Sequence, residues 1–304
     1  MDPRFIRTCT FATLHTPGYG TRVTLCNGVV PGRQYAMDAV VSMSAFDSDG
    51  NYLGESPPFL ELGPGELARV DVDAVLHDLS ANGSELRDVM GVLHLTPREH
   101  VGKTSVEVSK AELMAHTFAT DDFVEYFSYD GNVVTGVAYQ TGHMNDSRLA
   151  STRTTTIQAP KVIVSERVDT VLLLMNLCPD LAYDSEVTLR FAIMDSTGAE
   201  LVSSSVTVPP FAFRLLSARD VLARAGRRDD FAASGGLGTL FGHASDGSLV
   251  PLSMTRNDTT GAIAVDHTLP PVYYVSKWGG ELRKQGNARL AQRLFAKDHA
   301  KAAP

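Results

Sequence analysis

The stretch VTLRFAIMDSTGAELV, residues 187 to 202, decides the fold class. Every second residue of its first half is large and apolar: Val187, Leu189, Phe191 and Ile193. This period of two is typical of a β-strand with one buried face. The DSTG sequence that follows, residues 195 to 198, supplies turn-forming residues, so the stretch predicts a β-hairpin and favours a mainly β protein.

An earlier segment repeats this pattern. Residues 24–54 align with residues 173–202, so that Asn27 falls on Asn176 and Tyr35 on Tyr183, and FDSDG falls on MDSTG. Further blocks match in the same order: 68–76 with 213–222, 130–140 with 246–256, and 147–160 with 261–274. Because the order of the blocks is preserved, the sequence predicts an internal duplication.

The fold class that follows is mainly β, with two tandem duplicated antiparallel β-sandwich domains and a short C-terminal helix. We expect the first copy over 1–159, with an insertion near 97–128 that adds a strand pair and a short helix. The second copy covers 160–276, with the boundary at Ala159–Pro160. Residues 277–304 hold seven Lys or Arg against Glu281 and Asp298, and predict a basic amphipathic helical tail.

The second copy resembles the β-sandwich domain of the soluble sensory-rhodopsin transducer family. The features that carry this resemblance occur in order: TVLLLMN, SEVTLRFAIMD, VTVPPFAFRLL, and DGSLVPLSMTRNDT before a Gly/Ala-rich strand. The resemblance implies a non-enzymatic, oligomeric, cytoplasmic interaction module. None of these features is a functional motif, so no binding residues are transferred from the family.

Composition narrows the class of protein further. The 304 residues are 43% hydrophobic and 20% charged, as in a globular protein, and the net charge of −8 opposes general nucleic-acid binding. The apolar runs are too short for a signal sequence or a transmembrane segment, so we expect a cytoplasmic protein. Three cysteines are too few for a disulfide framework.

Motifs that carry chemistry are missing from the sequence. It contains no H-E-x-x-H, C-x-x-C, G-x-S-x-G or complete phosphate-binding glycine loop. The sequence therefore predicts no metal site and no cofactor, and it leaves any catalytic residue unknown.

The candidate binding residues come from the two expected closing strands. In an extended segment 262–269, Asp266 and His267 point to opposite faces, so they do not form an acid/base pair. His267 shares its face with Ile263 and Val265, as a core histidine would. The matching row of the first copy, residues 149 to 155, contains Arg153, which favours a polar neighbour at this face.

Two readings of this row therefore stay open: a core histidine, or a face that meets the other lobe, another subunit or a ligand. Polar residues on the loops before these strands and on the N-terminal segment extend the candidate set. The ligand-binding candidates are His15, His143, Asp146, Arg148, Arg153, Arg256, Asp258 and His267.

Two functions fit these features. The first is a non-catalytic binding or interaction module, a scaffold or adaptor for a protein partner or a small apolar ligand, assembling as a homo-oligomer. The alternative is a metal-independent acid/base enzyme that acts on a largely apolar small molecule at the inter-lobe cleft. We favour the first, because every standard catalytic motif is missing. A structural subunit of a larger assembly is a third, less favoured reading.

Overall fold

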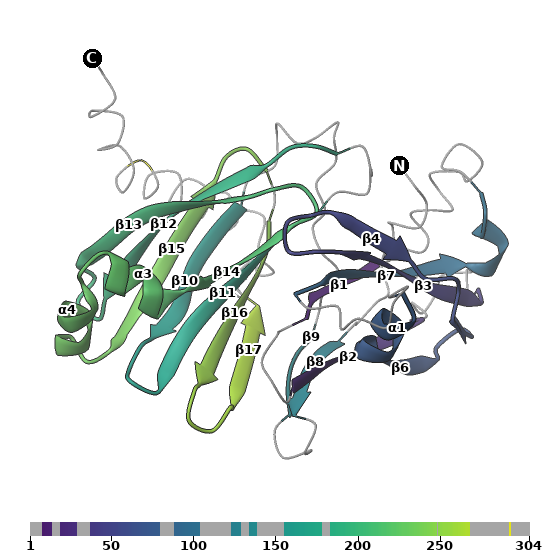
Figure 1. Ribbon diagram of the computed structural model, residues 1–304, viewed down its shortest axis with the longest axis horizontal. Coiled ribbons are helices and arrows are strands. Elements are labelled where there is room, and N and C mark those ends of the chain that lie inside the picture. The colour runs from purple at the N-terminus through teal and green to yellow at the C-terminus, as the bar shows by residue number, and fades with distance from the viewer. Residues whose placement is uncertain are drawn as a thin grey trace, which may run out of the picture. The chain divides into compact units, whose positions relative to one another are not determined.

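The computed structural model describes residues 8–13, 19–28, 37–79, 88–103, 123–128, 134–138, 155–177, 183–247, 249–267 and 292. The chain divides into two compact units (Figure 1). Unit 1 contains Met1–Ser147, Met175–Ser185 and Pro209–Phe213, and unit 2 contains Arg148–Leu174, Glu186–Val208 and Arg214–Pro304. Antiparallel sheets dominate both units, which confirms the predicted mainly β sandwich class.

The first β-sandwich, here called sandwich 1, has two sheets. One has the strand order β1-β7-β3-β4, with β5 also paired to β3. Its strands are β1 (Thr8–Ala12), β3 (Ala39–Phe46), β4 (Tyr52–Glu55), β5 (Leu60–Leu62) and β7 (Met90–Pro97). The other has the order β6-β2-β8-β9, made of β2 (Tyr19–Cys26), β6 (Leu67–Asp71), β8 (Phe123–Ser128) and β9 (Val134–Ala138). Helix α1 (Val72–Leu79) follows β6, and the short 3-10 helix η2 (Arg98–His100) follows β7.

The core of sandwich 1 is apolar, and one hydrogen bond joins its two sheets. The hydroxyl of Tyr126 on β8 donates to the carbonyl oxygen of Ala12 on β1 at 3.0 Å. Large side chains around it are fully buried: Phe11, Leu25, Met43 and Leu93. Burial of each such side chain stabilises the fold by about 1.5–3 kcal/mol.

The second β-sandwich, here called sandwich 2, has the strand orders β10-β15-β12-β13 and β14-β11-β16-β17. Its first sheet is made of β10 (Thr155–Ile163), β12 (Val187–Asp195), β13 (Glu200–Val208) and β15 (Leu237–Ala244). Its second sheet is made of β11 (Val168–Asn176), β14 (Phe213–Ser217), β16 (Leu249–Asn257) and β17 (Ile263–His267). Helices α3 (Ala218–Arg224) and α4 (Arg228–Ala233) connect β14 to β15.

Strand β12 shows why the sequence pattern forms this sheet. The four alternating apolar residues of its sequence are buried, whereas Arg190 between them is exposed. The predicted strand and its hairpin turn are therefore confirmed.

Two hydrogen bonds of the Thr170 hydroxyl hold β11 next to β10. The hydroxyl accepts from the Ile163 N–H at 2.8 Å and donates to the Ile163 carbonyl at 3.2 Å.

The two sandwiches share one strand order. The strands correspond in order from β1 and β10 to β9 and β17, with β4 and β5 of sandwich 1 together in the place of β13, and α1 and α3 follow equivalent strands. Common origin by duplication stays a prediction, because strand order alone does not establish descent.

An asparagine occupies the same place in both sandwiches. Asn27, after β2, donates its side-chain N–H groups to the carbonyls of Met37 at 2.8 Å and Leu62 at 3.0 Å. Asn176, the last residue of β11, donates to the carbonyls of Ser185 at 3.0 Å and Pro209 at 3.1 Å. In sandwich 1 these contacts fix the chain before β3 and at the end of β5. In sandwich 2 they fix the chain before β12 and directly after β13, which agrees with the alignment of the two asparagines.

The closing strand of the first copy was predicted in the wrong place. Residues 155–163 form β10, the first strand of sandwich 2, and β9 closes sandwich 1 instead. The proposed equivalence of Arg153 and His267 is therefore wrong, because pairing in the sheet places β9 beside β8 as β17 lies beside β16. The expected boundary at Ala159–Pro160 falls inside β10, and unit 1 gives way to unit 2 at Ser147–Arg148.

The expected insertion near 97–128 ends in β8, whose counterpart in sandwich 2 is β16, and its residues 104–122 lie outside the described part. The matching blocks 68–76 and 213–222 each contain the start of a short helix, α1 and α3, and Gly226 follows α3 with φ 65°. Asp229 and Asp230 lie in the first turn of α4, where a helix favours acidic side chains. Apart from Gln292, the basic tail 277–304 lies outside the described residues.

Candidate functional site

The structure describes three of the eight predicted site residues. His15, His143, Asp146, Arg148 and Arg153 lie outside the described residues. His267 ends β17, where its backbone pairs with Leu252 of β16. Arg256 and Asp258 lie at the β16–β17 turn, and the structure brings these two together.

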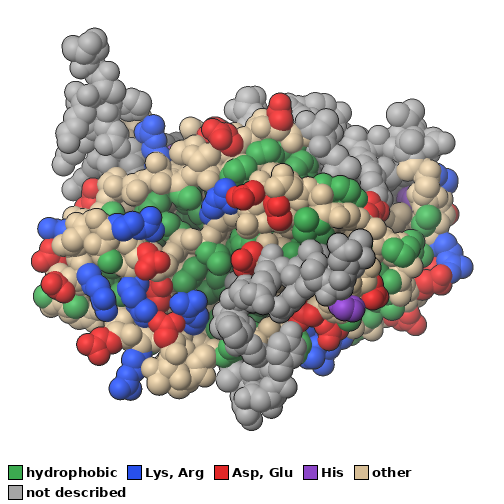
Figure 2. All heavy atoms as spheres, in the orientation of Figure 1, with side chains coloured by type: hydrophobic (Ala, Val, Ile, Leu, Met, Phe, Trp, Pro, Cys, Tyr) green, Lys and Arg blue, Asp and Glu red, His purple; other side chains and the backbone are tan. Residues whose placement is uncertain are grey.

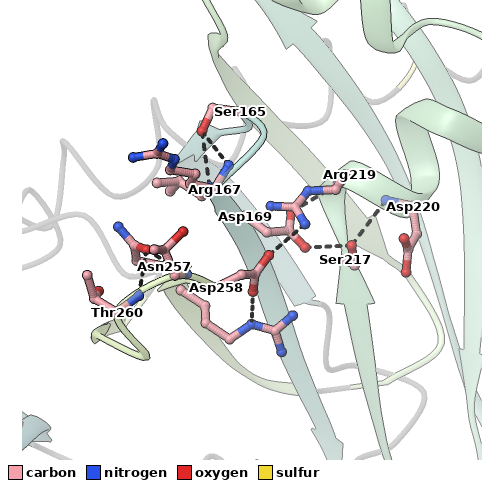
Figure 3. A network of polar contacts seen from close by, with 12 residues as sticks. Ser165, Arg167, Asp169, Ser217, Arg219, Asp220, Asn257, Asp258 and Thr260 are labelled. Carbon is pink, nitrogen blue, oxygen red and sulfur yellow. Dashed lines mark hydrogen bonds and ion pairs between the residues drawn. The ribbon is translucent and has the colours of Figure 1, made fainter.

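Asp258 joins three segments of unit 2 (Figure 3). Its carboxylate accepts a hydrogen bond from Arg219 Nη1 at 2.6 Å and another from Arg256 Nε at 2.8 Å. Its backbone N–H donates to the carbonyl of Arg167 at 2.8 Å, in the turn between β10 and β11. We call this group the Asp258 cluster: Arg167, Arg219, Arg256 and Asp258.

A buried aspartate, Asp169, holds the backbone that carries Arg219 of the cluster. Asp169 is 2% exposed, and its carboxylate accepts from Ser217 Oγ at 2.6 Å and from the Arg219 N–H at 3.0 Å. The same Ser217 hydroxyl oxygen accepts from the Asp220 N–H at 3.1 Å, which caps the first turn of α3. Asp169 thus fixes the start of α3, and with it the position of Arg219.

The electrostatics of the cluster favour the ionised form of the Asp258 carboxylate. The hydrogen bond from Arg219 holds the pKa of Asp258 below its usual value of 3.8, with a smaller effect in the same direction from Arg256. A general acid or base works best with a pKa near the working pH. Since both oxygens of Asp258 are committed to guanidinium groups, the arrangement is suited to holding loops together rather than to moving protons.

Acid should weaken this cluster first. The folded-state pKa of Asp258 lies below the ordinary value of 3.8, so the folded state binds fewer protons than the unfolded state. Its stabilisation is therefore complete above pH 3.8 and disappears as the pH falls through the folded-state pKa. We expect Asp258→Asn to flatten the loss of unfolding free energy as the pH falls below about 4, measured by urea unfolding. Parallel pH curves for the variant and the wild type would contradict this role.

The buried histidines of unit 1 also hold structure together. His94 is fully buried on β7, and its Nε2 lies 2.9 Å from the hydroxyl of Ser44 on β3, which is 3% exposed. His100 is 2% exposed and lies 3.2 Å from a carboxylate oxygen of Glu99. Within the described residues, no three His, Cys, Asp or Glu side chains lie close enough together to hold a metal ion.

Strand β13 lies at the edge of its sheet. Among the described strands it pairs only with β12, so residues 201–207 present one row of backbone N–H and C=O groups away from the sheet (Figure 1). Ser203, Ser204 and Ser205 are exposed, although α3 contacts the strand. Natural proteins usually protect an edge of this length with charges, prolines or bulges, because it can pair with another strand.

Sandwich 1 protects the equivalent edge. There the strand is split into β4 and β5, which pair with different parts of β3, and Pro57–Pro58 lie between them. A proline has no N–H to donate to a sheet ladder. In β13, residues 201–208 contain neither proline nor a charged side chain. Within the described residues, the same edge is thus interrupted in sandwich 1 and continuous in sandwich 2.

Sequence reasoning missed this edge. The signal was present in the aligned segments, where ESPPF follows the fourth strand of the first copy and LVSSSVTV continues it in the second. Which strand lies at the edge of a sheet depends on pairing between distant segments.

On the face shown in Figure 2, the basic and acidic side chains of the described residues are interspersed.

Comparisons with known proteins add little. No family model and no curated protein matches the chain. A β-glucuronidase from glycoside hydrolase family 2 aligns with a TM-score of 0.17 and 9% identity, over 85% of this chain and 23% of that chain. A calcium-binding mutant of Bacteroides uniformis β-glucuronidase 2 aligns with a TM-score of 0.15 and 11% identity, over 85% of this chain and 25% of that chain. The chain thus spans about a quarter of these enzymes, and scores this low carry no argument.

One physical property bears on the setting of the protein. No helix in the part of the chain that the structure describes has the length and apolar character needed to cross a membrane.

Proposed function

We propose that the chain is a non-catalytic β-sandwich interaction module that binds a protein segment by adding a strand to the edge of β13. The observation that carries this proposal is the contrast between the two equivalent edges, one interrupted by Pro57–Pro58 and the other continuous over Glu200–Val208. A strand added at an open edge gains main-chain hydrogen bonds along its length, and alternate side chains give specificity.

The polar clusters have a structural role. Asp169 and Asp258 fix the turns at one end of sandwich 2 and the start of α3. These contacts hold the sheet β14-β11-β16-β17, which is the sheet of sandwich 2 that does not carry β13. The acid/base enzyme remains the alternative, and no observation in the described residues favours it. A cytoplasmic setting and kinship with the sensory-rhodopsin transducer family are further proposals that fit an interaction module.

A synthetic peptide with the sequence of residues 200–208 is a suitable probe, because it can form the same ladder as a natural strand. We expect the fluorescently labelled peptide to bind the full chain saturably, with binding followed by fluorescence anisotropy. A peptide N-methylated at consecutive residues loses donors on both of its edges, and we expect it to bind at least about tenfold more weakly.

A matched pair of variants locates the binding. Ser204→Ala keeps the backbone N–H and should bind the peptide as the wild type does, whereas Ser204→Pro should not. The N-methylated peptide keeps the test valid where the proline variant does not fold, since it uses the wild-type chain. Equal binding of the plain and N-methylated peptides, or no binding of either, would overturn the proposal.

A further inference from the structure

We infer that the strand bound at β13 is the β13 strand of a second copy of this chain, related by a two-fold axis through Ser204. The inference rests on the proposed function, and it names the partner. Its basis is the sequence VSSSV of residues 202–206, which reads the same in both directions around Ser204. An antiparallel pair related by a two-fold axis places such a sequence against itself.

The pairing matches residues of like character on each face. With Ser204 opposite its own copy, Val202 lies opposite Val206 of the second copy, and Ser203 lies opposite Ser205 of the second copy. In the sheet of sandwich 2, Val202 and Val206 pair with Ile193 and Leu189 of β12, so they lie on the face that carries the apolar row. Ser204 pairs with Phe191 and lies on the same face, so the two-fold arrangement places a valine pair on each side of a central serine pair.

The opposite face consists of small hydroxyl side chains. Ser203 and Ser205 are exposed on that face, and neither brings a charge to the axis. Directly opposed like charges destabilise a strand pair, and a serine pair avoids that cost. The product is one continuous sheet that runs through both copies from β10 to β10.

Charges placed on the exposed serine pair test the register. In Ser203→Lys/Ser205→Lys, lysines oppose lysines across the axis, and we expect the dimer to dissociate at least about tenfold more readily than the wild type. In Ser203→Lys/Ser205→Glu, each lysine opposes a glutamate of the second copy, and the dimer should be at least as stable as the wild type. Both variants change the same exposed positions, so each is a folding control for the other.

Sedimentation equilibrium of the full chain gives the readout, with the wild type expected at twice the chain mass of 32.7 kDa. The 200–208 peptide should dissociate this dimer, whereas its N-methylated form should not, and this comparison needs no variant. A wild type that stays monomeric at every concentration while it binds the peptide would overturn the inference and leave the proposed function standing. A monomer that binds no peptide would overturn both. A dimer with the same affinity in both double variants would overturn the inference alone.

Discussion

Replacing Asn176 with alanine should lower the free energy of unfolding by about 3–5 kcal/mol, among the largest effects of a single substitution in this chain. The side chain is fully buried, donates to the carbonyls of Ser185 and Pro209, and accepts from the hydroxyl of Tyr183 at 3.1 Å. Alanine removes all three hydrogen bonds and leaves their partners without a replacement in a buried place. Urea unfolding followed by far-UV circular dichroism measures the difference.

Two other asparagines give the scale for this prediction. Asn27→Ala removes the equivalent two carbonyl contacts and should cost about 2–3 kcal/mol. Asn51→Ala removes an exposed contact to Asp47 and should cost less than about 1 kcal/mol. If Asn176→Ala cost no more than Asn51→Ala, the asparagine would not have the stabilising role assigned to it.

Gly50→Ala should destabilise the chain by about 2 kcal/mol more than Gly198→Ala. Both glycines lie in equivalent hairpin turns with positive φ, 91° at Gly50 and 84° at Gly198, so both substitutions share the cost of a left-handed backbone. A Cβ at Gly50 would clash with the carbonyl oxygen of Pro210, whereas a Cβ at Gly198 would meet nothing within 4 Å. The difference between the two variants therefore isolates the contact with Pro210.

Thermal unfolding of the two variants checks this difference directly. Phe211, next to Pro210, has φ 56°, and its ring stacks on Phe46 with centroids 4.9 Å apart. The segment can therefore not retreat from a new Cβ without losing this stacking. Equal losses of stability in the two variants would show that Pro210 moves freely and that the contact constrains nothing.

Local features of the fold could be predicted from the sequence. The alternation in residues 187–193 predicted β12, and the two Asp-Ser-x-Gly turns predicted the hairpins. These features depend on residues close together in the chain. The alternation of side chains determines which face of a strand is buried, and the turn residues determine where a hairpin turns. The alignment of Asn27 with Asn176 also succeeded, because each asparagine serves the same two segments of its own sandwich.

Features set by distant segments could not be predicted. The closing strand of the first copy was misplaced, because the local pattern of residues 155–163 suits either end of a sandwich and only its pairing with β15 decides. The Asp258 cluster depends on Arg219, which is remote in sequence and is positioned by Asp169. Arg256 and Asp258 were predicted together, but as ligand-binding residues, whereas their described contacts fix turns.

The open edge of β13 is the central claim, and hydrogen exchange tests it most directly. The full chain, diluted until sedimentation shows a monomer, should be incubated in deuterated buffer with and without an excess of the 200–208 peptide, and exchange followed in each segment. We expect the peptide to slow exchange within residues 201–207 and to leave the equivalent edge at 52–62 unchanged. Protection at 52–62, or unchanged exchange throughout β13, would contradict the claim.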